Sequence, residues 1–137
     1  MKILIVGSGG REHALARSLT ECPTVESILC APGNAGTASV RNCRNVLAEN
    51  NEDILKISVS EKIDLVVIGP EMPLAAGLVD MLTRADIPAF GPSSSPARLE
   101  SSKGFAKDFM ARSGVATADY LKFDRPDAAM AGLDAFG

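Results

Sequence analysis

The sequence predicts an α/β fold, an open parallel sheet with helices on both faces. Three observations lead to this prediction. Short apolar runs alternate with segments of helical periodicity through the first 90 residues, as in chains built from strand–helix–strand units. The run that ends at Ile68 is continuously apolar, as expected of a central strand covered on both faces. A glycine-rich turn, Gly7–Gly10, joins the first strand to the first helix, and glycine allows such a tight connection.

Local signals then place the elements. Pro73 is a favoured first helical residue, and the leucines that follow it repeat every four residues as a buried stripe. Ser102 is a suitable N-cap and Gly114 a suitable residue just after a helix end. The expected strands are 2–6, 25–30, 64–68, 88–90 and 117–123. The expected helices are 11–20, 51–59 (with Ile54, Leu55 and Ile57 inward), one opening at Pro73 (with Leu74, Leu78 and Leu82 inward), 102–113 and 126–136; 91–96 is expected to be a loop.

Composition excludes several classes of protein. The chain of 137 residues is 46% apolar and 23% charged, which is ordinary for a soluble globular protein. No apolar run approaches the roughly 20 residues of a membrane span, and no cleavable signal stands at the start. The three cysteines have no metal-ligand spacing, so we expect a reduced, cytoplasmic compartment and no metal site. Net charge is −3 with scattered basic residues, so nucleic acid is not an expected partner.

The glycine-rich turn is the clearest candidate site. The helix after it presents free N–H groups and the positive end of its dipole to the turn, which favours an anion such as phosphate. A dinucleotide-binding fingerprint would have a third glycine where this chain has Glu12, and an acid after the second strand. The segment 31–34 reads Ala-Pro-Gly-Asn and has no acid. Redox chemistry on a dinucleotide is therefore disfavoured, whereas an anion site is not.

Three loops should meet at one edge of the sheet, because the carboxyl ends of parallel strands lie together. These loops are Gly7–His13, Ala31–Thr37 and Gly69–Leu74. The first offers N–H donors for phosphate, the second offers the Asn34 amide, and the third places a carboxylate, Glu71, beside a turn. Together they suit a ligand with phosphate at one end and hydroxyl or amine groups at the other.

Each of these residues also has a purely structural interpretation. Asn34 is equally well explained as a turn residue, and Glu71 as a charge at a helix N-terminus. Glu12 competes with an anion, so a bond to backbone or to a hydroxyl suits it better than phosphate. Structural roles are also expected for His13 on the first helix, for Lys103 and Lys107 as a solvated face, and for Phe105 and Phe109 as core residues.

Several motifs together resemble one family. They are GSGGREHALA from Gly7, APGNAGT from Ala31, KIDLVVIGPEMPL from Lys62, FGP from Phe90 and LESSKGFAKDFM from Leu99. In this order they resemble the N-terminal part of phosphoribosylamine–glycine ligases, which are ATP-grasp enzymes. The matching segments span nearly the whole chain, and the first and third are long enough to be specific.

The resemblance implies a reaction and roles for residues. The family joins glycine to 5-phosphoribosylamine in purine biosynthesis, with ATP and Mg²⁺ (or Mn²⁺), by way of a glycyl phosphate. By analogy the turn at Gly9–Arg11 would hold the ribose phosphate, Glu71 the ribose or amine end, and Lys103 an ATP phosphate. The substrate-binding residues implied are Gly9, Gly10, Arg11, Glu12, Asn34, Gly69, Pro70 and Glu71, with Lys103 for ATP.

The resemblance also implies a division of the chain. Residues 1–100 would form the substrate-binding domain of this family, a pre-ATP-grasp, Rossmann-like domain. Residues 101–137 would be a linker helix and the first elements of an ATP-grasp domain. Family members are much longer, and their Mg²⁺ ligands and most ATP-binding residues lie beyond the matched region. We therefore expect no catalytic residue here, no ligation by these 137 residues alone, and a monomer.

Two other functions stay open at this point. One is a non-catalytic, Rossmann-type nucleotide-binding regulatory domain, which tight binding of NAD or AMP would support. The other is a short interaction module made as a separate polypeptide. Ribose 5-phosphate binding would instead favour the ligase.

Overall fold

The computed structural model describes residues 1–136, which fall into two compact units: unit 1, Met1–Ala97, and unit 2, which begins at Arg98. None of the helices in this part of the chain is long and apolar enough to cross a membrane. The strands are β1 (Lys2–Gly7), β2 (Ser27–Pro32), β3 (Cys43–Asn45), β4 (Leu65–Ile68) and β5 (Ala89–Phe90). The helices are α1 (Gly10–Leu19), α2 (Ala35–Ala38), α3 (Asn51–Ser60), α4 (Glu71–Ala75), α5 (Leu78–Arg84), α6 (Ser94–Ser101), α7 (Lys103–Arg112), α8 (Pro126–Ala131) and the 3₁₀ turn η1 (Leu133–Phe136).

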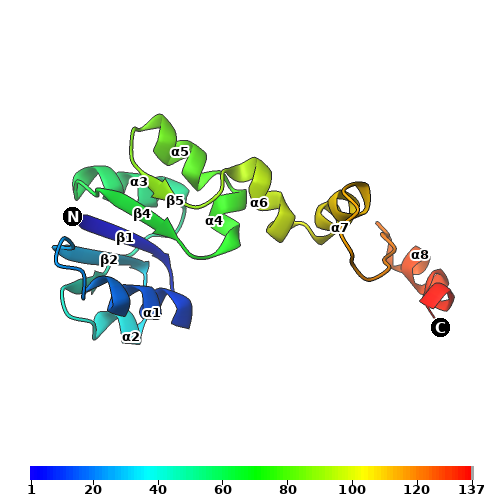
Figure 1. Cartoon of the computed structure of the whole chain (residues 1–137), viewed down its shortest axis with the longest axis horizontal. Coiled ribbons are helices and arrows are strands. Elements are labelled where there is room, and N and C mark those ends of the chain that lie inside the picture. Colours follow the sequence, from blue (N-terminus) through cyan, green and yellow to red (C-terminus); the bar gives the residue numbers. More distant parts are fainter. Residues whose placement is uncertain (137) are drawn as a thin grey trace. The chain divides into compact units, whose positions relative to one another are not determined.

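Unit 1 contains a five-stranded sheet in the order β3-β2-β1-β4-β5, in which all neighbours are parallel (Figure 1). The central strand β1 pairs with both β2 and β4, so Val6 lies opposite Ala31 on one side and Ile68 on the other. The chain steps outward from β1 in one direction through β3 and then returns to the other side of β1. The topological switch point therefore lies at the carboxyl ends of the adjacent strands β1 and β4, and open α/β sheets bind ligands at such a point.

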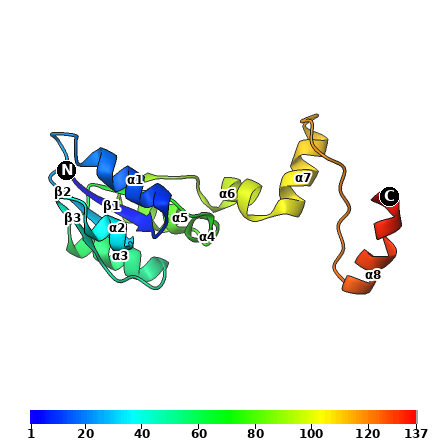
Figure 2. The same ribbon diagram turned by 90° about the horizontal axis from the view of Figure 1, so that it is seen from below.

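The two faces of the sheet bury different side chains, because successive strand residues point to opposite sides. Leu4 and Val6 pack with residues of α3, α4 and α5, whereas Ile3 and Ile5 pack with residues of α1. Helices thus cover both faces, with α1 on one side and α3 and α5 on the other (Figures 1 and 2). This confirms the predicted fold class.

The apolar patterns in unit 1 are confirmed, although one helix is divided. Leu74, Leu78 and Leu82 are all buried, as their spacing predicted. They do not share one helix: the chain breaks at Gly77, whose φ is +84°, and α4 and α5 lie on either side. Ile54 is buried as well, with Leu55 and Ile57 packed beside it. The three leucines therefore stay buried on one face although the helix is interrupted at Gly77.

Two elements that lie wholly within unit 1 were not predicted, β3 and the short helix α2. The strand β3 has only three residues, Cys-Arg-Asn, and it lies at the sheet edge with Arg44 and Asn45 exposed. It carries no apolar alternation that a sequence could reveal. The second expected strand also moves, from 25–30 to Ser27–Pro32, so Ala31 and Pro32 belong to β2.

The expectation of a loop at 91–96 is wrong over its second half, where α6 begins at Ser94. Ser94, Ser95 and Pro96 are the first three helical residues. Proline is tolerated in a first turn, because the N–H that it lacks would have no acceptor there.

In unit 2, the expected strand at 117–123 is not formed. The described part of this unit contains helices only, so no neighbouring strand is present to pair with. The segment is instead held by side chains of α7: Lys107 Nζ donates to Thr117 Oγ1 and to the Ala118 carbonyl, and Asp108 accepts from Tyr120 and Lys122. The ends of α7 agree with prediction, since Ser102 accepts from the Phe105 N–H and Gly114 follows at φ +66°.

Three side chains of α7 depart from their expected environments. Phe109 is 40% exposed within unit 2 rather than in a core. Phe105 is half-buried, and the Arg98 guanidinium lies 4.0 Å from the centre of its ring. Lys107 is not part of a solvated face, because its ammonium group holds the following segment.

The three cysteine thiols should differ in reactivity. Cys30 is buried, and burial raises its pKa to about 12; burial also raises the pKa of Cys43, whose sulfur lies 3.5 Å from that of Cys30. Cys22 is exposed, and a hydrogen bond with Thr24 lowers its pKa. Because the thiolate is the reactive form, Ellman's reagent at about pH 8 should modify Cys22 quickly, the half-buried Cys43 more slowly, and the buried Cys30 only on unfolding. The Cys22→Ser variant should lose the fast phase; a fast phase that survives would contradict this assignment.

Candidate functional site at the sheet switch point

A cavity of about 730 Å³ opens at the carboxyl ends of the strands in unit 1. Its walls come from the ends of β1 and β2, the start of α3, and α4. Most of its lining is apolar, and the polar part includes Glu12, Glu49 and Glu52. The lining residues are Val6, Gly7, Ser8, Gly9, Glu12, Ala31, Pro32, Ala48, Glu49, Asn50, Asn51, Glu52, Ile54, Pro70, Met72, Pro73, Ala76 and Met81.

The structure divides the predicted site residues into two groups. Three of them line the cavity: Gly9, Glu12 and Pro70. The others adjoin it without lining it: Gly10, Arg11, Asn34, Gly69 and Glu71. Lys103 is the first residue of α7 in unit 2 and is exposed.

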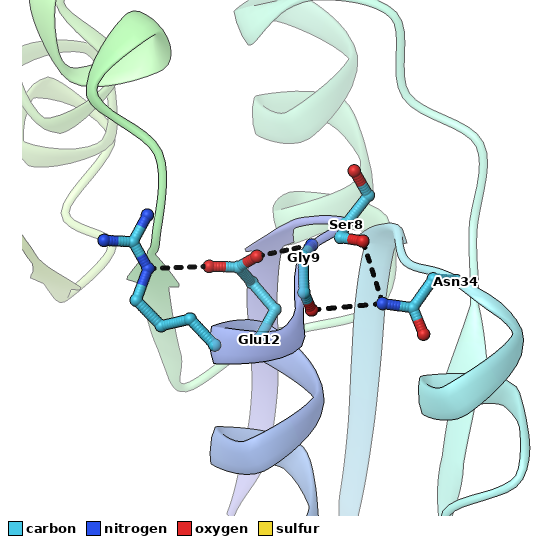
Figure 3. A network of polar contacts seen from close by, with 5 residues as sticks. Ser8, Gly9, Glu12 and Asn34 are labelled. Atoms are coloured by element: carbon cyan, nitrogen blue, oxygen red, sulfur yellow. Dashed lines mark hydrogen bonds and ion pairs between the residues drawn. The ribbon is translucent and has the colours of Figure 1, made fainter.

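Glu12 is the most unusual of these residues, because its carboxylate is buried. Its Oε2 accepts the Gly9 N–H at 2.6 Å, and its Oε1 accepts from Arg11 Nε at 3.2 Å (Figure 3). Glu12 is the third residue of α1 and Gly9 is the N-cap, so this bond satisfies one of the free N–H groups at the helix start. The structural interpretation, that Glu12 bonds to backbone, is confirmed.

Glycines at the ends of two adjacent strands make room for that carboxylate. A Cβ on Gly7 would lie 2.7 Å from Glu12 Cδ, and one on Gly69 would collide with Oε1. Gly7 ends β1 and Gly69 follows β4, with the Gly69 N–H bonded to the Val6 carbonyl at 3.0 Å. Glu12 therefore lies at the switch point itself, close to where a dinucleotide-binding protein would have its third glycine.

Asn34 connects the second loop to the first. Its Nδ2 donates to the carbonyls of Ser8 (2.8 Å) and Gly9 (3.1 Å), as Figure 3 shows, while its Oδ1 accepts the Thr37 N–H as the N-cap of α2. Both ends of the amide are thus engaged within the protein. The turn-residue interpretation of Asn34 is confirmed, and the turn that it supports is the glycine turn.

Sequence reasoning missed two residues behind Asn34. Thr37 is fully buried, and its hydroxyl bonds to Asn34 and to the side chain of Asn45. Asn45 Nδ2 in turn donates to the Asn34 carbonyl at 2.8 Å. The only signal was the polar Asn-x-x-Thr spacing, which marks a helix start; Asn45 is 11 residues away along the chain and comes close only through the β2–β3 pairing.

Pro70 lines the cavity at the start of α4, and Glu71 lies beside it at the rim. Pro70 is the N-cap of α4, and Glu71 is its first residue, so the helix begins two residues before Pro73. Glu71 is half-buried, and its charge is favourable at a helix N-terminus. Asn51 Nδ2 donates to the carbonyls of Pro73 and Ala76 and so joins α3 to α4.

The charges around the cavity distinguish its two ends. Among the described residues that line it, none is Lys, Arg or His, whereas three are Glu. The cation nearest to the turn is Arg11, whose side chain is 63% exposed. The carboxylates inside the cavity would accept hydroxyl or amine groups, whereas at the glycine turn an anion would find the N–H groups of Gly10 and Arg11 and the Arg11 side chain.

Comparison with known proteins identifies the family. Residues 1–100 match the profile of the family described as phosphoribosylglycinamide synthetase, N domain. The chain belongs to this family. The matched residues include β1 through β5 and the entire cavity.

Curated relatives agree along nearly the whole chain. The phosphoribosylamine–glycine ligase of Rhizobium meliloti (strain 1021) is 48% identical over 131 residues, which cover 96% of this chain and 31% of that protein. The enzyme of the same name from Neisseria meningitidis serogroup B is 48% identical over 129 residues, 94% of this chain and 30% of the relative. The chain spans less than a third of the length of these relatives.

Solved structures share the fold at lower identity. N5-carboxyaminoimidazole ribonucleotide synthetase from Thermus thermophilus matches with a TM-score of 0.67 and 23% identity, over 98% of this chain and 36% of that one. The biotin carboxylase domain of Hydrogenobacter thermophilus 2-oxoglutarate carboxylase, solved with MgADP and bicarbonate, matches with a TM-score of 0.72 and 15% identity, over 99% and 33%. These likenesses concern the fold alone.

Proposed function

We propose that this chain is the N-terminal, substrate-binding part of a ligase that joins glycine to 5-phosphoribosylamine at the expense of ATP. The observation that carries the proposal is the 48% identity to phosphoribosylamine–glycine ligases over 96% of the chain. Because that match covers 31% of the relative, the remaining steps of the reaction belong to regions outside it. Unit 1 supplies one wall of the phosphoribosylamine site.

The geometry of unit 1 supports a division of that substrate between two places. The phosphate lies near the N–H groups of Gly10 and Arg11, at the start of α1, where the helix dipole favours an anion. The ribose and amine face the carboxylate-lined cavity, with Glu71 at its rim. Gly9, Glu12, Asn34, Gly69 and Pro70 complete the substrate-binding set.

ATP and the divalent cation are assigned mainly to other parts of the ligase. In residues 1–136, no three His, Cys, Asp or Glu side chains are grouped so as to hold a metal ion. We therefore assign Mg²⁺, or Mn²⁺ in its place, to residues outside the matched region, where bound metal would offset the charge of the ATP phosphates. Lys103 is proposed as one ATP contact. The protein would act as a cytoplasmic monomer on small molecules.

A nucleotide-binding regulatory domain is the second candidate, because the strand order and the glycine turn are those of dinucleotide-binding folds. Two observations weigh against it. The Glu12 carboxylate occupies the turn, and no acid follows β2, which ends at Ala31–Pro32. Dinucleotide-binding folds have a glycine at the position of Glu12 and an acid after the second strand, and this chain has neither.

Ribose 5-phosphate, a stable stand-in for phosphoribosylamine, tests the proposal. The chain should bind it in calorimetric titration and should bind NAD or AMP far more weakly. Glu71→Ala should weaken ribose 5-phosphate binding by at least about tenfold, since a hydrogen bond to a charged group contributes about 1.5–3 kcal/mol. Glu26→Ala makes the same charge change just before β2, at the opposite edge of the sheet, and should leave the affinity unchanged.

Two results would contradict the proposal. Tight NAD or AMP binding without ribose 5-phosphate binding would support the regulatory domain. Equal losses in the Glu71→Ala and Glu26→Ala variants would show that general charge, rather than the rim of the cavity, governs the affinity.

A further inference from the structure

We infer that Glu12 is a positioning residue for the phosphate end of the ligand: it holds the turn at Gly9 and the Arg11 guanidinium in place without touching the phosphate itself. This inference rests on the proposed function. Glu12 would thus affect phosphate binding indirectly, through Gly9 and Arg11.

The burial of Glu12 sets it apart from the other acids of the site. Among the described residues, the buried polar or charged side chains are Glu12, Thr37 and Ser58. An ionised carboxylate is costly to bury unless it is paired and hydrogen-bonded. The side chain of Glu12 is 5% exposed and that of its partner Arg11 is 63% exposed. The carboxylate of the ion pair is therefore buried, whereas the guanidinium faces solvent.

The bond between them determines which part of Arg11 is free. Arg11 donates to Glu12 through Nε, the nitrogen nearest the aliphatic stem. The Nη groups, which form the outer end of the guanidinium, remain for another acceptor. A guanidinium held in this way is oriented in advance for the bidentate contact that phosphate accepts.

The Gly9 peptide is held from two sides as well. Its N–H is taken by Glu12 and its carbonyl by Asn34. The N–H groups of Gly10 and Arg11, at the first two positions of α1, have no acceptor within the helix. Glu12 and Asn34 thus fix the turn, and the free donors of Gly10 and Arg11 face whatever binds there.

A direct contact between Glu12 and the ligand's phosphate is disfavoured by charge. Both groups are anionic, and both carboxylate oxygens of Glu12 already accept hydrogen bonds. A Cβ on Gly7 would lie 2.7 Å from Glu12 Cδ, so the carboxylate packs closely against the end of β1. Glu12 therefore acts through Arg11 and Gly9.

A double-mutant cycle separates this role from direct contact. Affinity for ribose 5-phosphate is measured by calorimetry for the chain and for its Glu12→Gln, Arg11→Ala and doubly substituted variants. Each single change should weaken binding about fivefold to tenfold. The double variant should be no weaker than Arg11→Ala alone. Glutamine keeps an oxygen that can accept the Gly9 N–H, so the Glu12→Gln change acts through Arg11, which the double variant lacks. Glu21→Gln, at an exposed acid just after α1, is the matched charge control and should bind like the unmodified chain.

Multiplicative losses in the double variant would overturn the inference in favour of direct contact. Lower thermal stability of Glu12→Gln with unchanged affinity would overturn it in favour of a purely structural role. If the unmodified chain binds no ribose 5-phosphate, the proposed function fails. A second measurement then still tests whether Glu12 holds Arg11 in place.

That measurement is ¹⁵N relaxation of the arginine Nε–H groups in the unmodified chain. Arg11 Nε–H should be nearly as rigid as the backbone, with an order parameter of about 0.85, whereas Arg17, exposed on the same helix, should fall below about 0.6. It needs no Glu12 variant, so it also holds if Glu12→Gln fails to fold. Equal mobility of the two arginines would contradict positioning by Glu12.

Discussion

Replacing Gly7 with alanine is expected to destabilise unit 1 by about 2–5 kcal/mol, the sum of two costs. Gly7 has a φ of +131°, a conformation that side chains rarely adopt. The new Cβ would also lie 2.7 Å from Glu12 Cδ and would displace a buried, hydrogen-bonded carboxylate. Urea unfolding followed by far-UV circular dichroism measures the loss.

Gly10→Ala is the matched control, three residues along the same turn. A Cβ there meets no atom within 4 Å, and the position is the first of α1. Alanine should leave the stability unchanged or raise it by up to about 1 kcal/mol, because glycine is the poorer helix former. Similar losses at both positions would show that the turn tolerates no side chain, and that the Glu12 carboxylate is not the cause.

Leu78→Ala is expected to cost about 2–5 kcal/mol, as for other fully buried leucines. Leu78 opens α5 and is completely buried in the core on the α3–α5 face of the sheet. Removing its side chain leaves a cavity that strands on one side and helices on the other cannot readily close. The free energy of unfolding in urea is again the measurement.

Leu47→Ala makes the same chemical change at a side chain that is 90% exposed. Its effect should stay within about 0.5 kcal/mol. A large loss at Leu47, or a small one at Leu78, would contradict the assignment of Leu78 to the core.

Most of unit 1 could be predicted from the sequence because its apolar periods coincide with burial. Strand β1, helices α1 and α3, and the leucines of α4 and α5 all follow from such patterns. The strand β3 could not be predicted, because its three residues pair only where β2 lies beside them. In unit 2 local composition alone predicted a strand at 117–123, and without a neighbouring strand none forms.

For the site, the residues alone were enough to predict the glycine turn, the lack of an acid after β2, and the family. They also indicated that Glu12 would bond to backbone. The contacts of the turn became clear only from the folded chain. The carboxylate of Glu12 lies between the ends of β1 and β4, and Asn34, at the start of α2, donates to the carbonyl of Ser8 in the turn. These hydrogen bonds form because the order of the strands brings together residues that are far apart along the chain. A local sequence pattern does not contain that information, so the contacts could not be predicted from it.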